Sequence, residues 1–345
     1  LGIGFHAVVP NFKDLRRRED ETHRALGIYN LWTMPYATEI ANTEIITAAD
    51  GDETTVEYRT PKGTIRTKTI YDESMRKAGV SITHIAEHAI KSYKDYEAAG
   101  YIFENAKVSP NFEGYGKFYD KVGDRGLAVA FLSLAGSPLH LLQRELMPVE
   151  LFFYEIYDHP AEMQKCAESI GAYFDRVFAA VTGCPAEVFL LGANYDASVT
   201  YPLFFGQHIA PWLRRFADRL HKNGKYLLTH TDGENSGLLD HYLDSGFDIA
   251  DSVCPVPMTK LSLKQVREHF NGKISIMGGI PSVALLKNTM PDGEFDSFLD
   301  RFFSELGSGD HLILGISDTT PPNAEFERIK KIGERVLKFG AVRGQ

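Results

Sequence analysis

A histidine and an aspartate two residues apart are the part of the sequence with the clearest chemical potential. His230 and Asp232 follow the apolar run Lys225–Leu228. If a strand continues that far, both side chains leave the same face of it and converge on one point. An imidazole and a carboxylate so placed can bind a divalent metal, or can act as a base and its orienting partner in proton transfer. Asp232 followed by Gly233 is also ordinary turn chemistry, and Asp232 could instead cap the next helix.

Further ligand atoms could come from the ends of neighbouring strands. Cys254 could add a sulfur ligand, and Glu234 or Asp318 could add an oxygen. Each has a simpler interpretation, because a lone cysteine is most often a small buried hydrophobic residue and Asp318 could cap the last helix. The segment Asn194–Asp196 follows another apolar run. Its polar side chains could hydrogen-bond a substrate or could merely terminate a strand.

The elements that must position these residues alternate regularly along the chain. Six short apolar runs are predicted as strands, at Leu127–Leu134, Glu187–Leu191, Lys225–His230, Phe247–Val253, Ile274–Met277 and His311–Ile316. Amphipathic stretches predicted as helices lie between and after them, at Ala161–Ala180, Pro211–Lys222, Gly237–Leu243, Ser262–Phe270, Phe295–Leu306 and Ala324–Phe339. Strand-then-helix units in series, with strands apolar almost throughout, indicate an α/β fold with a parallel sheet buried on both faces.

Such a sheet can be open and doubly wound, or closed into an eight-stranded barrel. The barrel needs two more strands, which the first 126 residues could supply, for example at Gly4–Val9. A dinucleotide-binding fold would carry a glycine-rich turn after its first strand, and the near match at Gly2–Ala7 leaves no room for that strand. We therefore predict a (β/α)8 TIM barrel, whose chemistry gathers at the carboxyl ends of the strands.

The region before the strand–helix series has a different hydrophobic pattern. Between residues 40 and 70, β-branched residues recur with period two and are interrupted by turns at Asp50–Asp52 and Thr60–Gly63. This pattern predicts a small antiparallel β-meander. No internal repeat or low-complexity linker marks a boundary, so residues 1–345 are predicted to form a single domain with the meander at 40–70 as an appendage.

Composition narrows the class of partner. The chain has 345 residues and a formal net charge of −9, with 37 Lys+Arg against 46 Asp+Glu. Nucleic acid is not expected as a partner, because neutralising a phosphate backbone takes a basic face. No apolar stretch approaches the length of a membrane span, so no membrane association is expected. The chain has three cysteines, which are too few and too scattered for a disulfide framework. The expected compartment is therefore a reducing cytoplasm.

The residues at the strand ends resemble the uroporphyrinogen decarboxylase superfamily, and within it the cobalamin-dependent methyltransferase branch. The series from about Pro148 to Phe339 carries the resemblance, and the turn His230–Gly233 with its surroundings is the specific part. The other matching segments are Phe205–Lys225, Asp244–Asp248, Gly278–Pro281, Gly315–Pro322 and the meander with its turn Thr60–Gly63.

The resemblance implies a TIM barrel that binds zinc and docks a separate corrinoid protein. In the coenzyme M methyltransferases of this superfamily, zinc is held by a His-x-Cys pair and a distant cysteine. Here Asp232 replaces the first cysteine, and the region of the second, Gly315–Asp318, has none. A site rich in nitrogen and oxygen is more Lewis acidic and suits an ether oxygen better than a thiol. The implied zinc ligands are His230 and Asp232, with Cys254 or Asp318 as the third.

The implied reaction is O-demethylation, in which a methyl group passes from a small-molecule donor, best an aryl methyl ether, to Co(I) of the corrinoid protein. The residues expected in catalysis are His230, Tyr195 and Asp196, and those expected to contact the substrate are Asn194, Tyr195 and Phe205. A methyl transfer from a methylcobamide to a thiol or folate is the alternative within the same class. A uroporphyrinogen decarboxylase and a non-catalytic carrier module are alternatives from other classes. The decarboxylase would need several converging arginines, and none stands at the predicted strand ends.

Overall fold

A computed structural model describes residues 34–78, 83–123, 126–321 and 323–340. The central feature is a parallel sheet of six strands in the order β12-β11-β10-β9-β8-β7, so each strand lies beside its neighbours in sequence. The strands are β7 (Val129–Ser133), β8 (Val188–Ala193), β9 (Tyr226–His230), β10 (Ile249–Val253), β11 (Ser275–Pro281) and β12 (Leu312–Ser317). All six predicted strands are confirmed, and the α/β class with them.

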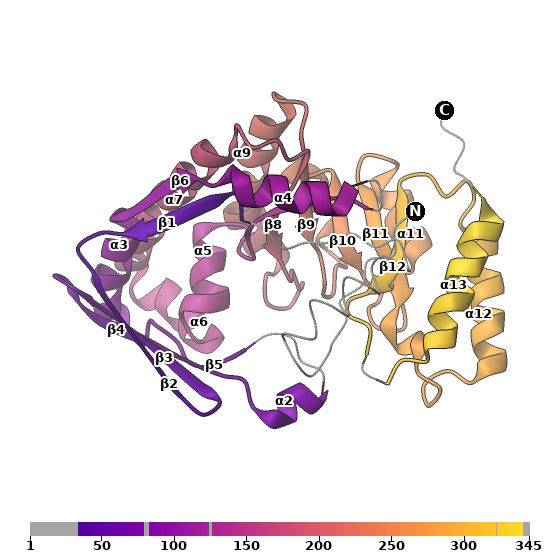
Figure 1. The fold of residues 1–345 in the computed structure, drawn as a ribbon, viewed down its shortest axis with the longest axis horizontal. Helices are drawn as coiled ribbons and strands as arrows, with labels where there is room; N and C mark the ends of the chain where they lie inside the picture. Colours follow the sequence, from indigo (N-terminus) through magenta and orange to yellow (C-terminus); the bar gives the residue numbers. More distant parts are fainter. Residues whose placement is uncertain (1–33, 79–82, 124–125, 322, 341–345) are drawn as a thin grey trace.

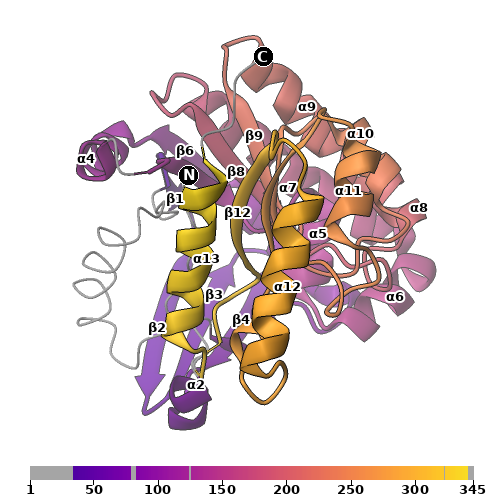
Figure 2. The same ribbon diagram turned by 90° about the vertical axis from the view of Figure 1, so that its right-hand side faces the viewer.

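Helices follow the strands and cover one face of the sheet (Figure 1). Six of them match the predicted helices: α7 (Pro160–Val181), α9 (Ala210–His221), α10 (Leu239–Ser245), α11 (Leu263–Phe270), α12 (Asp292–Glu305) and α13 (Phe326–Phe339). The helical segments not predicted in this part of the chain are α5 (Pro138–Leu141), η3 (Leu142–Leu146), α6 (Val149–Asp158), α8 (Pro202–Phe204), η4 (Phe205–Ile209) and η5 (Ser282–Leu285). Figure 2 shows α12 and α13 side by side next to β12.

Alternate residues of the strands enter two separate cores. Phe189, Leu227 and Ile276 belong to the large cluster that includes the helices. Val188 and Leu228 belong to a second, small cluster, which draws its members from the strands and the residues beside them. Because successive side chains of a strand point to opposite faces, both faces of this sheet are buried and apolar.

The described residues do not show a closed barrel. β7 and β12 are the two edges of the six-stranded sheet, and no pairing between them is present in the described part of the chain. The further strand predicted at Gly4–Val9 lies outside the described residues. The part of the TIM-barrel prediction that the structure shows is therefore the six-stranded parallel sheet with its helices.

Antiparallel strands stand beside this sheet, on the left-hand side of Figure 1. The meander predicted between residues 40 and 70 is present as β2 (Glu44–Asp50), β3 (Glu53–Thr60) and β4 (Gly63–Ile70), and a short strand not predicted, β5 (His84–Glu87), extends it. A separate pair is formed by β1 (Tyr36–Ile40) and β6 (Ala106–Pro110). The remaining elements of this region are α2 (Glu73–Ala78), η1 (Tyr93–Asp95), α3 (Tyr96–Glu104) and α4 (Phe112–Val122).

Within the described ranges, no helix has both the length and the apolar character needed to cross a membrane.

Candidate metal centre

Three potential ligands meet at the carboxyl edge of the parallel sheet. His230 is the last residue of β9, Asp232 follows it in the loop, and Asp318 follows the end of β12. One ligand atom from each lies within 4.8 Å of the others, and all three residues are partly buried. In the described residues this is the one such group of histidine, cysteine and acidic side chains. The structure thus brings together three of the four predicted metal ligands.

A third carboxylate, that of Asp251, fixes the orientation of the imidazole. Asp251 lies on β10, paired in register with His230 on β9, and its Oδ2 is 2.8 Å from Nδ1 of His230. A carboxylate can only accept here, so Nδ1 carries the hydrogen and donates it. The other ring nitrogen, Nε2, lies 3.4 Å from Oδ1 of Asp318. The hydrogen bond to Asp251 thus turns Nε2 toward the cluster. Metal-binding histidines are commonly oriented in this way, by a carboxylate that accepts the hydrogen of the other ring nitrogen.

The carboxylates of the cluster are themselves held by hydrogen bonds. Oγ of Ser252 donates to Oδ1 of Asp318 at 2.8 Å, and Nδ2 of Asn194 donates to Oδ2 of Asp232 at 3.3 Å. Both donors have positive φ angles, 62° for Ser252 and 56° for Asn194, and the strand register shifts beside each of them. Such bulges re-aim side chains near functional sites. The irregular ends of β8 and β10 therefore direct these donors to the cluster.

The clustered charges change the acid–base properties of the group. Burial by itself lowers the pKa of His230, but the hydrogen bond to Asp251 and the negative charges of Asp251, Asp318 and Asp232 outweigh it and raise this pKa to about 9. Burial and the charge of Asp318 raise the pKa of Asp232 to about 6, against the opposing effect of His230. The crowding of several carboxylates in a small volume contributes to both shifts, whereas burial adds to the shift of Asp232 and opposes that of His230.

The donor set fits a divalent metal ion. One imidazole nitrogen and two carboxylate oxygens are a common protein contribution to zinc, leaving room for a further ligand. Asp251 supplies the carboxylate that a metal-binding histidine usually contacts through its other ring nitrogen. The raised pKa values of His230 and Asp232 indicate the same fit, because protons there stand in for a cation that the carboxylates favour.

Cys254, the other predicted ligand, lies beside the cluster but is not part of it. Its Sγ is 3.5 Å from the carbonyl oxygen of Ser317 and 3.6 Å from Sδ of Met258. Burial, with the charges of Asp232 and Asp318, raises the pKa of its thiol to about 12. What sets Cys254 apart is its position, because its sulfur is not among the ligand atoms that converge within 4.8 Å of one another.

Two residues expected to act on the substrate lie in the core beneath the cluster. Tyr195 and Phe205 are both fully buried, with their ring centroids 4.9 Å apart. The hydroxyl of Tyr195 lies 3.0 Å from Oγ1 of Thr229, and burial raises its pKa. These side chains therefore support the floor of the site.

Asp196, the remaining predicted catalytic residue, joins two loops. Oδ2 accepts the backbone N–H of Glu234 at 3.0 Å, and Oδ1 accepts the backbone N–H of Ser198 at 2.8 Å. Burial acts to raise the pKa of Asp196, but these hydrogen bonds and that from the Ser198 hydroxyl outweigh it and lower the pKa. A carboxylate with its lone pairs so engaged stays ionised and braces the loops. Glu234 continues the brace, because its Oε2 accepts the backbone N–H of Lys260 at 2.9 Å.

Three residues near the cluster were not among the predicted ones: Asp251, Ser252 and Arg144. Asp251 offered a signal, since it is a charged residue within the otherwise apolar strand Ile249–Val253. Arg144 offered none, because it lies in a helical turn far from any predicted strand end. Its Nη1 donates to Oδ1 of Asn194 at 3.0 Å. No arginine stands at a predicted strand end, but Arg144 reaches this edge of the sheet from a helical turn.

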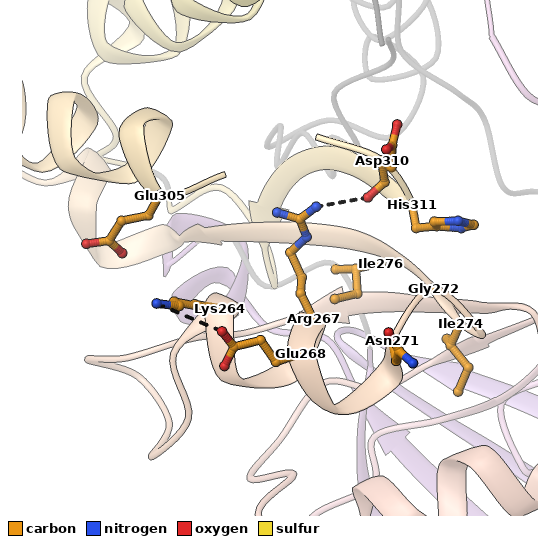
Figure 3. A pocket seen from close by; sticks show the side chains of 10 residues that line it. All are labelled: Lys264, Arg267, Glu268, Asn271, Gly272, Ile274, Ile276, Glu305, Asp310 and His311. Atoms are coloured by element: carbon orange, nitrogen blue, oxygen red, sulfur yellow. Dashed lines mark hydrogen bonds and ion pairs between the residues drawn. The ribbon is translucent and has the colours of Figure 1, made fainter. Parts of the chain in front are cut away.

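A hollow of about 310 Å³ lies at the other end of the strands (Figure 3). It is lined by residues at the start of β11 and just before β12, including Ile276 and His311. Arg267 crosses it to donate to the carbonyl oxygens of Leu306 and Asp310. Because ligands of parallel α/β sheets bind at the carboxyl ends of the strands, this hollow does not compete with the cluster as a functional site.

Comparisons with known proteins place the fold. The chain is similar to the structure of a methyltransferase from Methanosarcina mazei, with a TM-score of 0.55 and 13% identity over 97% of this chain and 87% of that one. At this identity the likeness shows a shared fold alone. A second similar structure, from Anabaena variabilis and named for a suggested sugar phosphate isomerase or epimerase activity, has a TM-score of 0.37 and 12% identity over 73% of this chain and 86% of that one. That score is too low to support an argument. No protein family and no curated protein matches the sequence.

Proposed function

We propose that this protein is a zinc-assisted methyltransferase that moves a methyl group from a small donor, best an aryl methyl ether, to Co(I) of a separate corrinoid protein. The observation that carries the proposal is the meeting of His230, Asp232 and Asp318 at the carboxyl edge of the sheet, with Asp251 behind His230. The fold shared with the methyltransferase from Methanosarcina mazei supports the general class. The resemblance of the His230–Gly233 turn to the cobalamin-dependent branch supports the finer assignment.

In this proposal the chain itself supplies binding and orientation. His230, Asp232 and Asp318 would hold the zinc ion. Bound zinc supplies Lewis acidity, which stabilises the negative charge that develops on the departing ether oxygen. Asp251 keeps Nδ1 of His230 protonated and hydrogen-bonded, so that Nε2 remains the donor atom. Asn194 and Ser252 prevent Asp232 and Asp318 from turning away.

Two measurements on purified protein test the proposal. Elemental analysis should find about one zinc per chain. The zinc-loaded protein, mixed with Co(I) corrinoid and a methoxylated aromatic, should give methylcobalt absorption and a free phenol. If the protein contains no zinc and decarboxylates a porphyrinogen, it is a decarboxylase instead. If it binds zinc but transfers a methyl group from none of the donors tested, the non-catalytic carrier module is the remaining alternative.

The affinity for zinc should rise with pH. With the pKa of His230 raised to about 9, zinc must displace a proton from the cluster at neutral pH. The apparent affinity should therefore rise roughly tenfold from pH 7 to pH 8, one proton being released per ion bound. Below pH 6 the dependence should steepen, because Asp232 is also protonated there. Competition against a chromophoric chelator measures the affinity, and equal values at pH 7 and pH 8 would contradict a protonated His230.

Replacing Cys254 by serine should leave the bound zinc in place. The thiol lies outside the group of converging ligand atoms and is held neutral by burial and the nearby carboxylates. We expect one zinc per chain and an affinity within about twofold of the unaltered protein, since no ligand is lost. A loss of zinc in this variant would contradict the expectation and would add Cys254 to the ligands.

A further inference from the structure

A positively charged side chain, that of Arg144, lies at the carboxyl edge of the sheet and has no role in the proposed function so far. Arg144 belongs to η3, the π-helical turn that follows β7 and α5. Its Nη1 donates to Oδ1 of Asn194, and Nδ2 of the same amide donates to Oδ2 of Asp232. The guanidinium, the amide and the carboxylate thus come from the segments that follow three neighbouring strands, β7, β8 and β9. Arg144 lies one side-chain amide away from the candidate metal centre.

The guanidinium is oriented but not fully occupied. Nε lies 3.2 Å from Oε1 of Glu145, and Nη1 lies 3.0 Å from Oδ1 of Asn194. Nη2 has no hydrogen-bond partner in the part of the chain that the structure describes. The side chain is 22% exposed. A planar group fixed at two of its nitrogens presents the third in a set direction, which favours recognition of a planar anion.

The turn that carries Arg144 is anchored to the loop that follows β8. The neighbouring side chain, Gln143, is 4% exposed, and its Nε2 donates to the carbonyl oxygen of Val199 at 3.2 Å. π-helical turns are frequent at functional sites. The buried contact of Gln143 therefore fixes the turn that places Arg144.

The groups beneath Arg144 add no negative charge beside it. His140 is buried, and its Nδ1 accepts the backbone N–H of Gly136 at 3.1 Å. Burial, helped by the positive charge of Arg144, lowers the pKa of His140 to about 3, so this ring is neutral. Tyr195, whose ring lies 5.3 Å from that of His140, is neutral as well. Among the described residues, Glu145 is the one ion-pair partner of Arg144, at Nε, and on its other side the guanidinium faces the neutral amide of Asn194.

We propose that Arg144 determines substrate specificity by binding a carboxylate on the methyl donor. The inference rests on the proposed function, because the methyl donor is the substrate of that reaction. The three carboxylates of Asp232, Asp251 and Asp318 outnumber the two positive charges of a bound zinc ion, so an anionic substrate needs a further cation on the same edge. Arginine is the side chain best matched to a carboxylate. The amide of Asn194 between the two sites sets the separation of the anionic end of the donor from its reacting oxygen.

Equilibrium binding tests this inference without relying on turnover. The probes are para-methoxybenzoate and its neutral counterpart para-methoxybenzamide, titrated into zinc-loaded protein in a calorimeter. The unaltered protein should bind the acid at least about tenfold more tightly, the size expected for one charge-assisted pair. Arg144→Met should reduce this preference to about twofold or less, and Arg144→Lys should retain part of it because the charge remains. Arg215→Met is the matched control, since Arg215 pairs with Asp175 away from this edge.

The outcomes separate this inference from the proposed function. Equal binding of the two probes by the unaltered protein, or an unchanged preference in Arg144→Met, overturns the role of Arg144. Methyl transfer from both probes at the same rate would do so as well, while leaving the methyltransferase intact. A preference that depends on Arg144 in a protein that transfers no methyl group would support the anion site and reject the proposed reaction.

Discussion

Replacing His230 by alanine should remove the zinc and abolish methyl transfer. His230 provides the one nitrogen ligand of the cluster, and its Nε2 faces Asp318. Without it the two remaining carboxylates cannot retain zinc at micromolar concentration. Loss of the Lewis acid should cost about 4 kcal/mol in transition-state stabilisation, or roughly a thousandfold in rate. Elemental analysis gives the zinc content, and single-turnover methylation of Co(I) corrinoid gives the rate.

A second histidine–aspartate pair provides the control for this experiment. His269 and Asp240 lie 2.8 Å apart, the same separation as His230 and Asp251, but on the surface helices α10 and α11. His269→Ala should keep both zinc and activity. Because His230→Ala leaves the buried Asp251 without its partner, His230→Gln should be measured beside it, and the melting temperature of both recorded. Full activity in folded His230→Ala would reject the metal centre.

Replacing Asp251 by asparagine should weaken zinc binding without removing a ligand. The amide keeps the shape of the side chain, and its oxygen can still accept the hydrogen of Nδ1 of His230. What is lost is the negative charge that orients the imidazole and makes it a stronger ligand. Changes of this kind typically reduce metal affinity by about 10- to 100-fold. Competition with a chelator at fixed pH measures the loss.

The pH dependence of this variant separates an electrostatic role from a merely structural one. Asp251 is the main group that raises the pKa of His230, so Asp251→Asn should bring that pKa down. The rise in zinc affinity between pH 7 and pH 8 should then become shallower than in the unaltered protein, because fewer protons need to be displaced. Asp240→Asn alters the surface pair instead and should change neither property. An unchanged pH slope in Asp251→Asn would show that its charge does not act on His230.

Much of the architecture follows from local sequence pattern. The six strands from β7 to β12 and the six predicted helices lie where the apolar runs and amphipathic stretches place them. Burial on both faces demands apolar residues at nearly every strand position, which makes such strands easy to find. The meander at 44–70 follows from period-two alternation and turn residues. Barrel closure does not follow in this way, since it depends on pairing between strands far apart in the sequence.

The candidate ligands also differ in how far the sequence alone predicts them. The spacing of His230 and Asp232, two residues apart after an apolar run, is enough by itself to indicate a possible metal pair, because strand geometry fixes side chains at that spacing on one face. Asp318 lies 86 positions further along the chain and joins them only because β9 and β12 end at the same edge of the sheet. Spacing cannot tell Asp318 from Cys254 as the third ligand, since both follow strand ends.

Only the tertiary structure decides how the candidate ligands are supported. Asp251 reaches His230 through the register of β9 with β10, and Arg144 reaches Asn194 from a π-helical turn. Tyr195, polar and adjacent to Asn194 in sequence, is instead turned fully into the core. The physical reason is that local spacing fixes which side chains share a face of one strand, whereas register, bulges and the packing of distant segments fix which of them meet.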